Sequence, residues 1–223
     1  MTPSIAAIIV GIDGWEKYTL PLIESIHKHE PECSIAVIDN ASKTPYPRID
    51  FSRERLNIHR TERLSYSAAI NYGKSRFWTH SIGSGGIREI TYDWYIVLSN
   101  DVLCTGPFAH VLEGYSDDSV VGPLLLETLI PHLGMIPYLE GWCMAFSKRC
   151  WNAIDGFDEG YLMSSFEDVD ASQEARKAGF GLVEDKELLF KHLDQKQRFY
   201  LPGYGGSEEH NMRRFMAKNG VTA

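Results

Sequence analysis

The sequence predicts an α/β fold in which one Rossmann-like, mostly parallel sheet carries helices on both faces. Three continuous apolar runs, at residues 5–10, 34–38 and 94–98, predict its central strands. Strands of a parallel sheet are buried on both faces, so they lack the alternation of half-exposed strands. Residues 18–29 carry apolar residues at helical spacing between the first two runs. This βαβ arrangement is the repeating unit of parallel sheets.

The remaining elements follow from the same patterns. Residues 41–55 are rich in Pro, Ser, Asp and Arg, which predicts a loop. Gly179 has the position of a left-handed residue that ends a helix. We expect helices at residues 65–78, 108–115, 148–154, 167–178 and 208–218, and strands at 120–124, 141–146 and 188–192.

Length and charge restrict the class of protein. The chain has 223 residues, 43% of them hydrophobic, which fits one domain with a sizeable core. Its net charge of −8 gives no long-range attraction to a phosphate backbone, so we expect no nucleic acid partner. Four arginines lie within residues 53–63. They fit an anion-binding segment and a solvated connection equally well.

The cysteines and the apolar segments predict the compartment. Cys33, Cys104, Cys143 and Cys150 include no Cys-x-x-Cys pair, so we expect free, mostly buried thiols in a reducing environment. The apolar run at 5–10 is far too short to span a bilayer, and no signal peptide pattern precedes it. We therefore predict a cytoplasmic protein without a transmembrane segment.

Polar residues follow the second and third strands at the point where each ends. Asp39 and Asn40 follow one strand, and residues 99–101 follow the other. Ligands of open parallel sheets bind at the carboxyl ends of the strands. Asp39 fits a hydrogen bond to a nucleobase or ribose, or alternatively a turn that closes the strand.

A cluster of acidic and aromatic residues lies between residues 156 and 170. Glu167, Asp168 and Asp170 fall at a predicted helix start, where the helix dipole favours carboxylates. Carboxylates beside aromatic side chains suit a site that abstracts a proton. A capped helix on the surface is the alternative interpretation.

The segments 37–42, 98–101, 156–159 and 166–170, followed by His192, occur in an order that resembles the GT-A glycosyltransferases of family 2. The rhamnosyltransferase-like members are the most similar, and the resemblance covers residues 4–195. It implies a nucleotide-sugar donor, a divalent metal ion, Mn²⁺ or Mg²⁺, and inversion at the anomeric carbon. It also implies one GT-A domain over residues 1–223, with a nucleotide-binding half at 1–100, a metal and acceptor half at 101–200, and a C-terminal helix or lid at 201–223.

The resemblance places the nucleotide against the first half of the chain. Two departures from the family pattern are Gly11 with Asp13, where Pro or Thr is usual, and Ser99 in place of the first Asp of the Asp-x-Asp motif. The residues that it assigns to the nucleotide are Gly11, Asp13, Asp39, Asn40, Arg63, Asn71, Ser99 and Asn100.

The metal is expected on Asp101, with His192 as a second ligand or as a merely structural histidine. Asp168 is the expected catalytic base, which takes the proton of the acceptor hydroxyl. The remaining substrate contacts are expected from Trp142, Asp158 and Glu167. Trp142 equally fits a place in the core, and Asp158 equally fits a structural turn.

We therefore expect an inverting, metal-assisted transfer of a hexose from a UDP- or dTDP-linked donor to a hydroxyl of a glycan acceptor. A nucleotidyltransferase is one alternative, although the acidic loop at residues 11–16 argues against it. A non-catalytic nucleotide-sugar-binding module is the other, and Ser99 supports it. Glycines at 203–206 suggest either a lid over the donor or an ordinary loop. No acceptor domain is evident, which leaves open that the chain is one domain of a larger protein.

Overall fold

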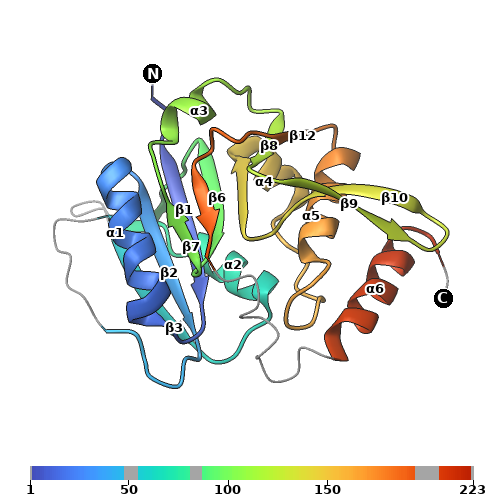
Figure 1. Ribbon diagram of the computed structural model, residues 1–223, viewed down its shortest axis with the longest axis horizontal. Helices are drawn as coiled ribbons and strands as arrows, with labels where there is room; N and C mark the ends of the chain where they lie inside the picture. Colours follow the sequence, from blue (N-terminus) through green and yellow to red (C-terminus); the bar gives the residue numbers. More distant parts are fainter. Residues whose placement is uncertain (1, 48–54, 81–86, 194–205, 222–223) are drawn as a thin grey trace.

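The computed structural model describes residues 2–47, 55–80, 87–193 and 206–221. Its centre is a seven-stranded sheet in the order β12-β8-β11-β6-β1-β2-β3 (Figure 1). Neighbouring strands are parallel except where β11 pairs with β6 and β8. The strands are β1 (Ile5–Gly11), β2 (Ser34–Asn40), β3 (Leu56–Thr61), β6 (Trp94–Ser99), β8 (Ser119–Gly122), β11 (Cys143–Ser147) and β12 (Gly181–Glu184).

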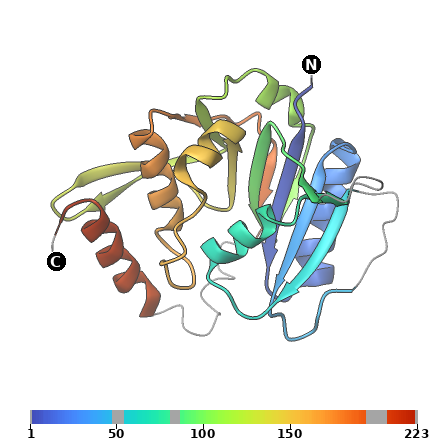
Figure 2. The same cartoon turned by 180° about the vertical axis from the view of Figure 1, so that it is seen from behind.

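Helices cover both faces of this sheet, which confirms the predicted fold class. Side chains of β1 alternate between two cores: Ile9 packs with α1 (Leu20–His29) and α3 (Ala109–Glu113), and Ile8 packs on the opposite face. There the sheet is covered by α2 (Tyr66–Lys74), α4 (Lys148–Ile154) and α5 (Glu167–Lys177), which Figure 2 shows from behind. Every residue of β1 and β2 is buried, as the continuous apolar runs predict.

A third, smaller core lies beyond the end of the sheet. The hairpin of β9 (Leu125–Ile130) and β10 (Gly134–Leu139) lies beside α5 and approaches α6 (Ser207–Lys218) in Figure 1. The buried residues of this third core come from the hairpin, the segment around α5 and the last helix: Ile130, Ile136, Tyr161, Val169, Phe215 and Met216. Burying these side chains is what docks α6 against the rest of the molecule.

Two short strand pairs complete the fold. β7 (Val102–Cys104) pairs antiparallel with β13 (Phe190–His192), so the end of the late strand lies opposite the start of β7. β4 (Trp78–His80) pairs with β5 (Ile87–Glu89). A π-helical turn, η1 (Trp15–Thr19), precedes α1.

The structure corrects several expected elements. The helix expected at 65–78 ends at Lys74, and Trp78 begins β4. The strand expected at 120–124 ends at Gly122, before a proline that cannot donate to a ladder. β3, the β9–β10 hairpin and β12 were not predicted. Each of these strands is partly exposed and lacks a continuous apolar run.

Two further findings concern the thiols and membrane spans. All four cysteines are free and buried, as predicted. Burial raises the pKa of the Cys104 thiol to about 11, so this group stays protonated at neutral pH. Across the described parts of the chain, no helix is long and apolar enough to span a bilayer. The expected lid at 203–206 lies, apart from its last glycine, outside the described residues.

Candidate active site

Asp101 and His192 meet at the carboxyl end of β6. The pairing of β7 with β13 places them together, and His192 Nε2 lies 3.2 Å from Asp101 Oδ2. The Leu193 amide also donates to the Asp101 carbonyl at 2.8 Å. Asp101 is almost fully buried, and His192 Nδ1 is buried without a hydrogen-bond partner among the described residues. The two residues that the sequence predicts as metal ligands are therefore in contact.

Trp142 holds His192 from one side. The two rings stack with centroids 5.2 Å apart and an angle of 21° between their planes. The indole Nε1 donates to Glu140 Oε2 at 2.6 Å, which fixes the orientation of the ring. Trp142 thus belongs to the edge of the core, which is one of its two interpretations, and it also touches the candidate metal ligand. Its contact with substrate stays a prediction.

Asp168 lies in the first turn of α5. Its Oδ1 accepts from the Val169 amide at 2.9 Å, and its Oδ2 accepts from the Gly141 amide at 3.0 Å. Burial raises the pKa of this carboxyl above its ordinary value, and the negative charge of Glu140 raises it further, against the opposing effect of the two amides. A carboxylate with a raised pKa is a stronger base than an ordinary aspartate.

Gly141 connects Asp168 to the metal-ligand pair. A Cβ at this position would lie 3.0 Å from Asp168 Cβ, a tight contact that would displace the carboxylate by a few tenths of an ångström. The carbonyl of Gly141 accepts from the Tyr66 hydroxyl at 3.4 Å, and the same hydroxyl lies 3.5 Å from Ser99 Oγ. Gly141 is followed in the sequence by Trp142, which stacks on His192.

Tyr66 lies among the acidic residues of the site. Burial raises the pKa of its phenol, and the charges of Glu167, Asp101 and Asp168 raise it further. The phenol is therefore neutral at physiological pH. The Ser99 amide donates to the Trp142 carbonyl at 3.1 Å, and the preceding Gly141 amide donates to Asp168. Asp101, two residues after Ser99, and Asp168 therefore lie at the same edge of the sheet.

Asp39 has partners within the protein. Its carboxylate accepts from the Ser42 and Tyr46 amides at 2.9 and 3.1 Å and from Arg60 Nη1 at 2.6 Å. Burial would raise the pKa of Asp39, but these hydrogen bonds outweigh it and hold the pKa below its ordinary value. The structure thus gives this side chain the turn-closing contacts that were the alternative interpretation.

Asn40 and Asn71 also bond to the protein's own backbone. Asn40 exchanges two hydrogen bonds with the backbone of Leu64, at 3.0 and 2.8 Å. Asn71 does the same with Phe157, at 2.8 and 3.0 Å, and so fastens the 156–159 segment to α2.

Gly11, Asp13 and Asn100 lie in one buried polar network. Asn100 Nδ2 lies 3.2 Å from the Asp13 carbonyl and 3.3 Å from the Tyr46 hydroxyl. A Cβ at Gly11 would lie 2.5 Å from that hydroxyl, so the network closes only over glycine. Asp13 has a positive φ of 57°, and its Oδ1 accepts from the Lys43 amide at 2.7 Å.

Arg63 is an exposed cation close to this network. It interacts electrostatically with Asp13, and its guanidinium makes no hydrogen bond or ion pair within the part of the chain that the structure describes. Of the residues expected at the nucleotide, it retains the most hydrogen-bonding capacity for a phosphate.

Two of the expected substrate contacts are also located. Asp158 is bound by Arg214 at 2.6 and 2.9 Å, so its carboxylate serves an ion pair with α6. Glu167 is buried at the start of α5, next to Asp168. Sequence patterns did not single out Glu140, Gly141 or the Tyr66 hydroxyl, because none of them belongs to a recognisable spacing. The run of Gly141 and Trp142 before a buried strand was the only signal.

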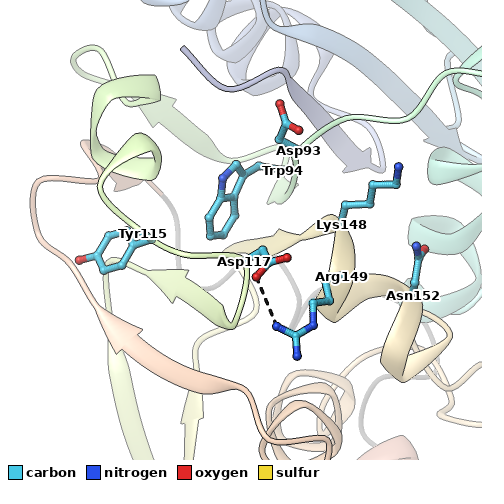
Figure 3. A pocket seen from close by; sticks show the side chains of 7 residues that line it. All are labelled: Asp93, Trp94, Tyr115, Asp117, Lys148, Arg149 and Asn152. Atoms are coloured by element: carbon cyan, nitrogen blue, oxygen red, sulfur yellow. Dashed lines mark hydrogen bonds and ion pairs between the residues drawn. The ribbon is translucent and has the colours of Figure 1, made fainter. Parts of the chain in front are cut away.

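A cavity of about 590 Å³ lies elsewhere, at the opposite end of β6 (Figure 3). Lys148 and Arg149 of α4 line it, and Arg149 pairs with Asp117 at 3.3 Å. Trp94 begins β6 and Ser99 ends it, so about 17 Å of strand separates this cavity from the candidate site. The remaining lining residues are Asp93, Trp94, Tyr115 and Asn152.

No family model matches the sequence. Uncharacterized proteins of Mycobacterium bovis and Mycobacterium tuberculosis are 24% identical over 216 residues, which cover 85% of this chain and 74% of each relative. Their identity is too low to assign a family.

Solved structures of glycosyltransferases share the fold. A mannosyltransferase of Pyrobaculum calidifontis in complex with GDP-Man and Mn²⁺ superposes with a TM-score of 0.66 at 12% identity, over 98% of this chain and 64% of that one. GalNAc-T7 with UDP, GalNAc and Mn²⁺ gives 0.70 at 12% identity, over 96% of this chain and 48% of that one. TarS of S. aureus gives 0.55 at 14% identity, over 81% and 58% of the two chains. This chain thus spans between about half and two thirds of these neighbours, and it has the GT-A fold.

Proposed function

We propose that this chain is an inverting, metal-assisted glycosyltransferase. It moves a hexose from a UDP- or dTDP-linked donor to a hydroxyl of a glycan acceptor. The observation that carries the proposal is the convergence of Asp101 and His192 with Asp168 around Tyr66 and the segment 141–142. The GT-A fold of the neighbours supports it.

Asp168 is the base in this proposal. Inversion requires that the acceptor oxygen attack the anomeric carbon from the side opposite the departing diphosphate, while a carboxylate takes the hydroxyl proton. The amides of Val169 and Gly141 hold the two oxygens of Asp168 in place, and the raised pKa favours proton transfer to it. Glu167 is buried beside it, and we assign this residue to orienting the acceptor.

Asp101 and His192 would hold the divalent metal ion. A carboxylate suits Mg²⁺ and Mn²⁺, histidine is a common metal ligand, and these ions take most of their other ligands from water and substrate phosphates. Nε2 of His192 faces Asp101 Oδ2 at 3.2 Å, so this nitrogen and that carboxylate are the pair that would share the ion. When bound, such an ion neutralises the charge that develops on the departing diphosphate.

The nucleotide is expected along the carboxyl ends of β1 and β2. Asp39, Asn40, Asn71 and Asn100 bond within the protein, so we assign them to shaping this surface. Arg63 is assigned to a direct contact with the base or a phosphate.

A thermal-shift panel of UDP-, dTDP- and GDP-hexoses, with and without Mn²⁺, tests the proposal. A donor at about 100 times its dissociation constant stabilises the folded state by about 2.7 kcal/mol. We expect a shift that requires Mn²⁺ and that Asp101→Ala abolishes. Arg149→Ala, in the distant cavity, is the matched control and should keep the shift. No shift with any donor would contradict the proposal.

A non-catalytic nucleotide-sugar-binding module is the second candidate. Ser99 favours it, because a hydroxyl that faces Tyr66 replaces a carboxylate at the first motif position. Among the described residues, no group of three acidic, His or Cys side chains is arranged to hold a metal ion. Release of nucleoside diphosphate from a bound donor in the presence of Mn²⁺ distinguishes the two, since a module binds the donor without consuming it.

A further inference from the structure

One face of α6 is fastened to the chain on either side of Asp168. Asn211, Arg214 and Lys218 lie three and four residues apart and so share a side of the helix. Arg214 binds both oxygens of Asp158, and Lys218 Nζ binds Asp170 Oδ2 at 2.7 Å. This C-terminal helix lies outside the part of the chain whose motifs carry the chemistry.

Asn211 contacts the loop between these two ion pairs. The side chain is fully buried, and its Oδ1 accepts from the Leu162 amide at 2.8 Å. Its Nδ2 donates to the carbonyls of Leu162 at 2.8 Å and Ser165 at 2.9 Å, with the Ser164 carbonyl at 3.4 Å. All of these hydrogen bonds are to the backbone of one loop, residues 162–165.

That loop has an unusual backbone. Met163, Ser165 and Phe166 have positive φ values of 54°, 97° and 68°. Residues other than glycine rarely adopt such values, which persist where surrounding contacts hold them. On the other side of the loop, the Tyr66 amide donates to the Met163 carbonyl at 2.7 Å.

The loop leads directly into the candidate base. Phe166 is the N-cap residue of α5, and Asp168 follows two residues later. The direction in which α5 starts, and hence the place of the Asp168 carboxylate against Gly141, depends on the loop conformation.

We propose that Asn211 is a positioning residue for Asp168. It acts through the loop backbone and touches neither donor nor acceptor. The inference rests on the proposed function, in which Asp168 is the base. It extends the catalytic unit to α6, because a helix near the C-terminus is then required for proton transfer as well as for packing.

The variants follow from the contacts. Asn211→Ala removes all of them. Asn211→Asp keeps the acceptor for the Leu162 amide but turns a charged oxygen toward carbonyls that need a donor. His210→Ala, on the exposed side of the same helix, and Asn152→Asp, which adds the same charge on the exposed side of α4, are the matched controls.

The test is a double-mutant cycle with Asp168→Asn. The probe is release of nucleoside diphosphate, with Mn²⁺, from UDP-glucose or the best donor of the panel. We expect Asn211→Ala and Asn211→Asp to lower kcat by 10-fold or more, because small misplacements of reacting groups have effects of this order. Donor dissociation constants should stay within twofold, and both controls should behave as the parent protein does. In the Asp168→Asn background, Asn211→Ala should lower the residual rate no further.

Each failure has its own signature. Full turnover in Asp168→Asn overturns the assignment of the base, and with it the proposed function. Lost turnover in Asp168→Asn with parental kcat in folded Asn211→Ala overturns only the positioning role. An equal loss in both backgrounds overturns it as well, because Asn211 would then act independently of Asp168.

Hydrogen exchange provides a readout that needs no activity. In Asn211→Ala we expect faster exchange at the amides of Leu162 and Val169, with the Lys148 amide unchanged. If that variant does not fold, Asn211→Ser is measured in the same way. Unchanged exchange at Leu162, or faster exchange throughout the molecule in both variants, contradicts a local positioning role.

Discussion

At the scale of single residues, Gly141 is where the separate parts of the site touch. Its amide donates to Asp168, its carbonyl accepts from Tyr66, and its missing Cβ leaves room for the carboxylate. Trp142 then reaches His192 through ring stacking. A side chain at position 141 would disturb the base without touching the metal ligands directly.

We therefore predict that Gly141→Ala lowers kcat by about 10-fold or more and leaves donor affinity nearly unchanged. The new methyl would lie 3.2 Å from Asp168 Oδ2 and would push the carboxylate aside by a few tenths of an ångström. Overpacking should lower the free energy of unfolding by about 1–3 kcal/mol. Gly181→Ala is the matched control, since a Cβ there meets nothing within 4 Å. Parental turnover in Gly141→Ala would remove Gly141 from the site.

The raised pKa of Asp168 predicts the pH dependence of turnover. Burial is its main cause and the nearby charge of Glu140 adds to it, against the hydrogen bonds from the Val169 and Gly141 amides. A base works when deprotonated, so kcat/KM should fall as the pH drops through this raised pKa. Glu140→Gln removes a negative charge and should move that limb to lower pH. The kcat/KM profiles are recorded at saturating Mn²⁺. If the acid limb does not move in Glu140→Gln, the charge of Glu140 does not raise the pKa of Asp168.

At the scale of elements, the ends of β2 and β3 are joined by an ion pair. Arg60 of β3 binds Asp39 at the end of β2, and the Ser42 and Tyr46 amides complete the arrangement. The segment that follows β2 therefore folds back, and its Ser42 and Tyr46 amides donate to the Asp39 carboxylate at the end of β2. This pairing stabilises the sheet edge along which the nucleotide is expected.

The lowered pKa of Asp39 predicts how this edge responds to acid. A carboxyl whose folded pKa lies below its unfolded value contributes stability above the unfolded pKa, and that contribution disappears as the pH falls through the folded pKa. Asp39→Ala should lower the free energy of unfolding at pH 7 by about 1–3 kcal/mol and should flatten its decline below about pH 4. Urea unfolding at several pH values measures both. If the free energy of unfolding declines equally steeply in acid in Asp39→Ala, carboxylates other than Asp39 are responsible for that decline.

Some elements were predictable from the sequence because one physical signal dominates them. β1, β2 and β6 are continuous apolar runs, and α5 ends beside Gly179, whose φ is +89°. The β9–β10 hairpin gave no such signal, since its strands are half exposed and depend on α5 and α6 for cover. The three-residue pairing of β7 with β13 is too short to be recognised from a pattern, although it brings His192 to Asp101.

At the scale of the whole molecule, the order of the strands brings distant segments to one edge of the sheet. Residues near 101, 141, 168 and 192 meet there, and α6 closes the arrangement from the C-terminal side. The sequence predicted which side chains follow strand ends, but it could not tell their partners. Asn40 and Asn100 follow the predicted strands, and Asn71 lies within the predicted helix, yet their amides bond to the protein's own groups. Contacts between residues so far apart in sequence depend on packing that no local pattern encodes.

The central claim is that Asp101 and Asp168 serve one site, and paramagnetic broadening by Mn²⁺ tests it most directly. Nuclear magnetic resonance spectra are recorded with UDP or dTDP while Mn²⁺ is added in small amounts, with Mg²⁺ as the diamagnetic control and Asp101→Ala as the site control. We predict that the amide signals of Leu193, Gly141 and Val169 broaden together while that of Lys148, at the far end of β6, stays sharp. If the Leu193 signal broadens while the signals of Gly141 and Val169 stay as sharp as that of Lys148, Asp101 and Asp168 belong to separate sites. That result would contradict the central claim.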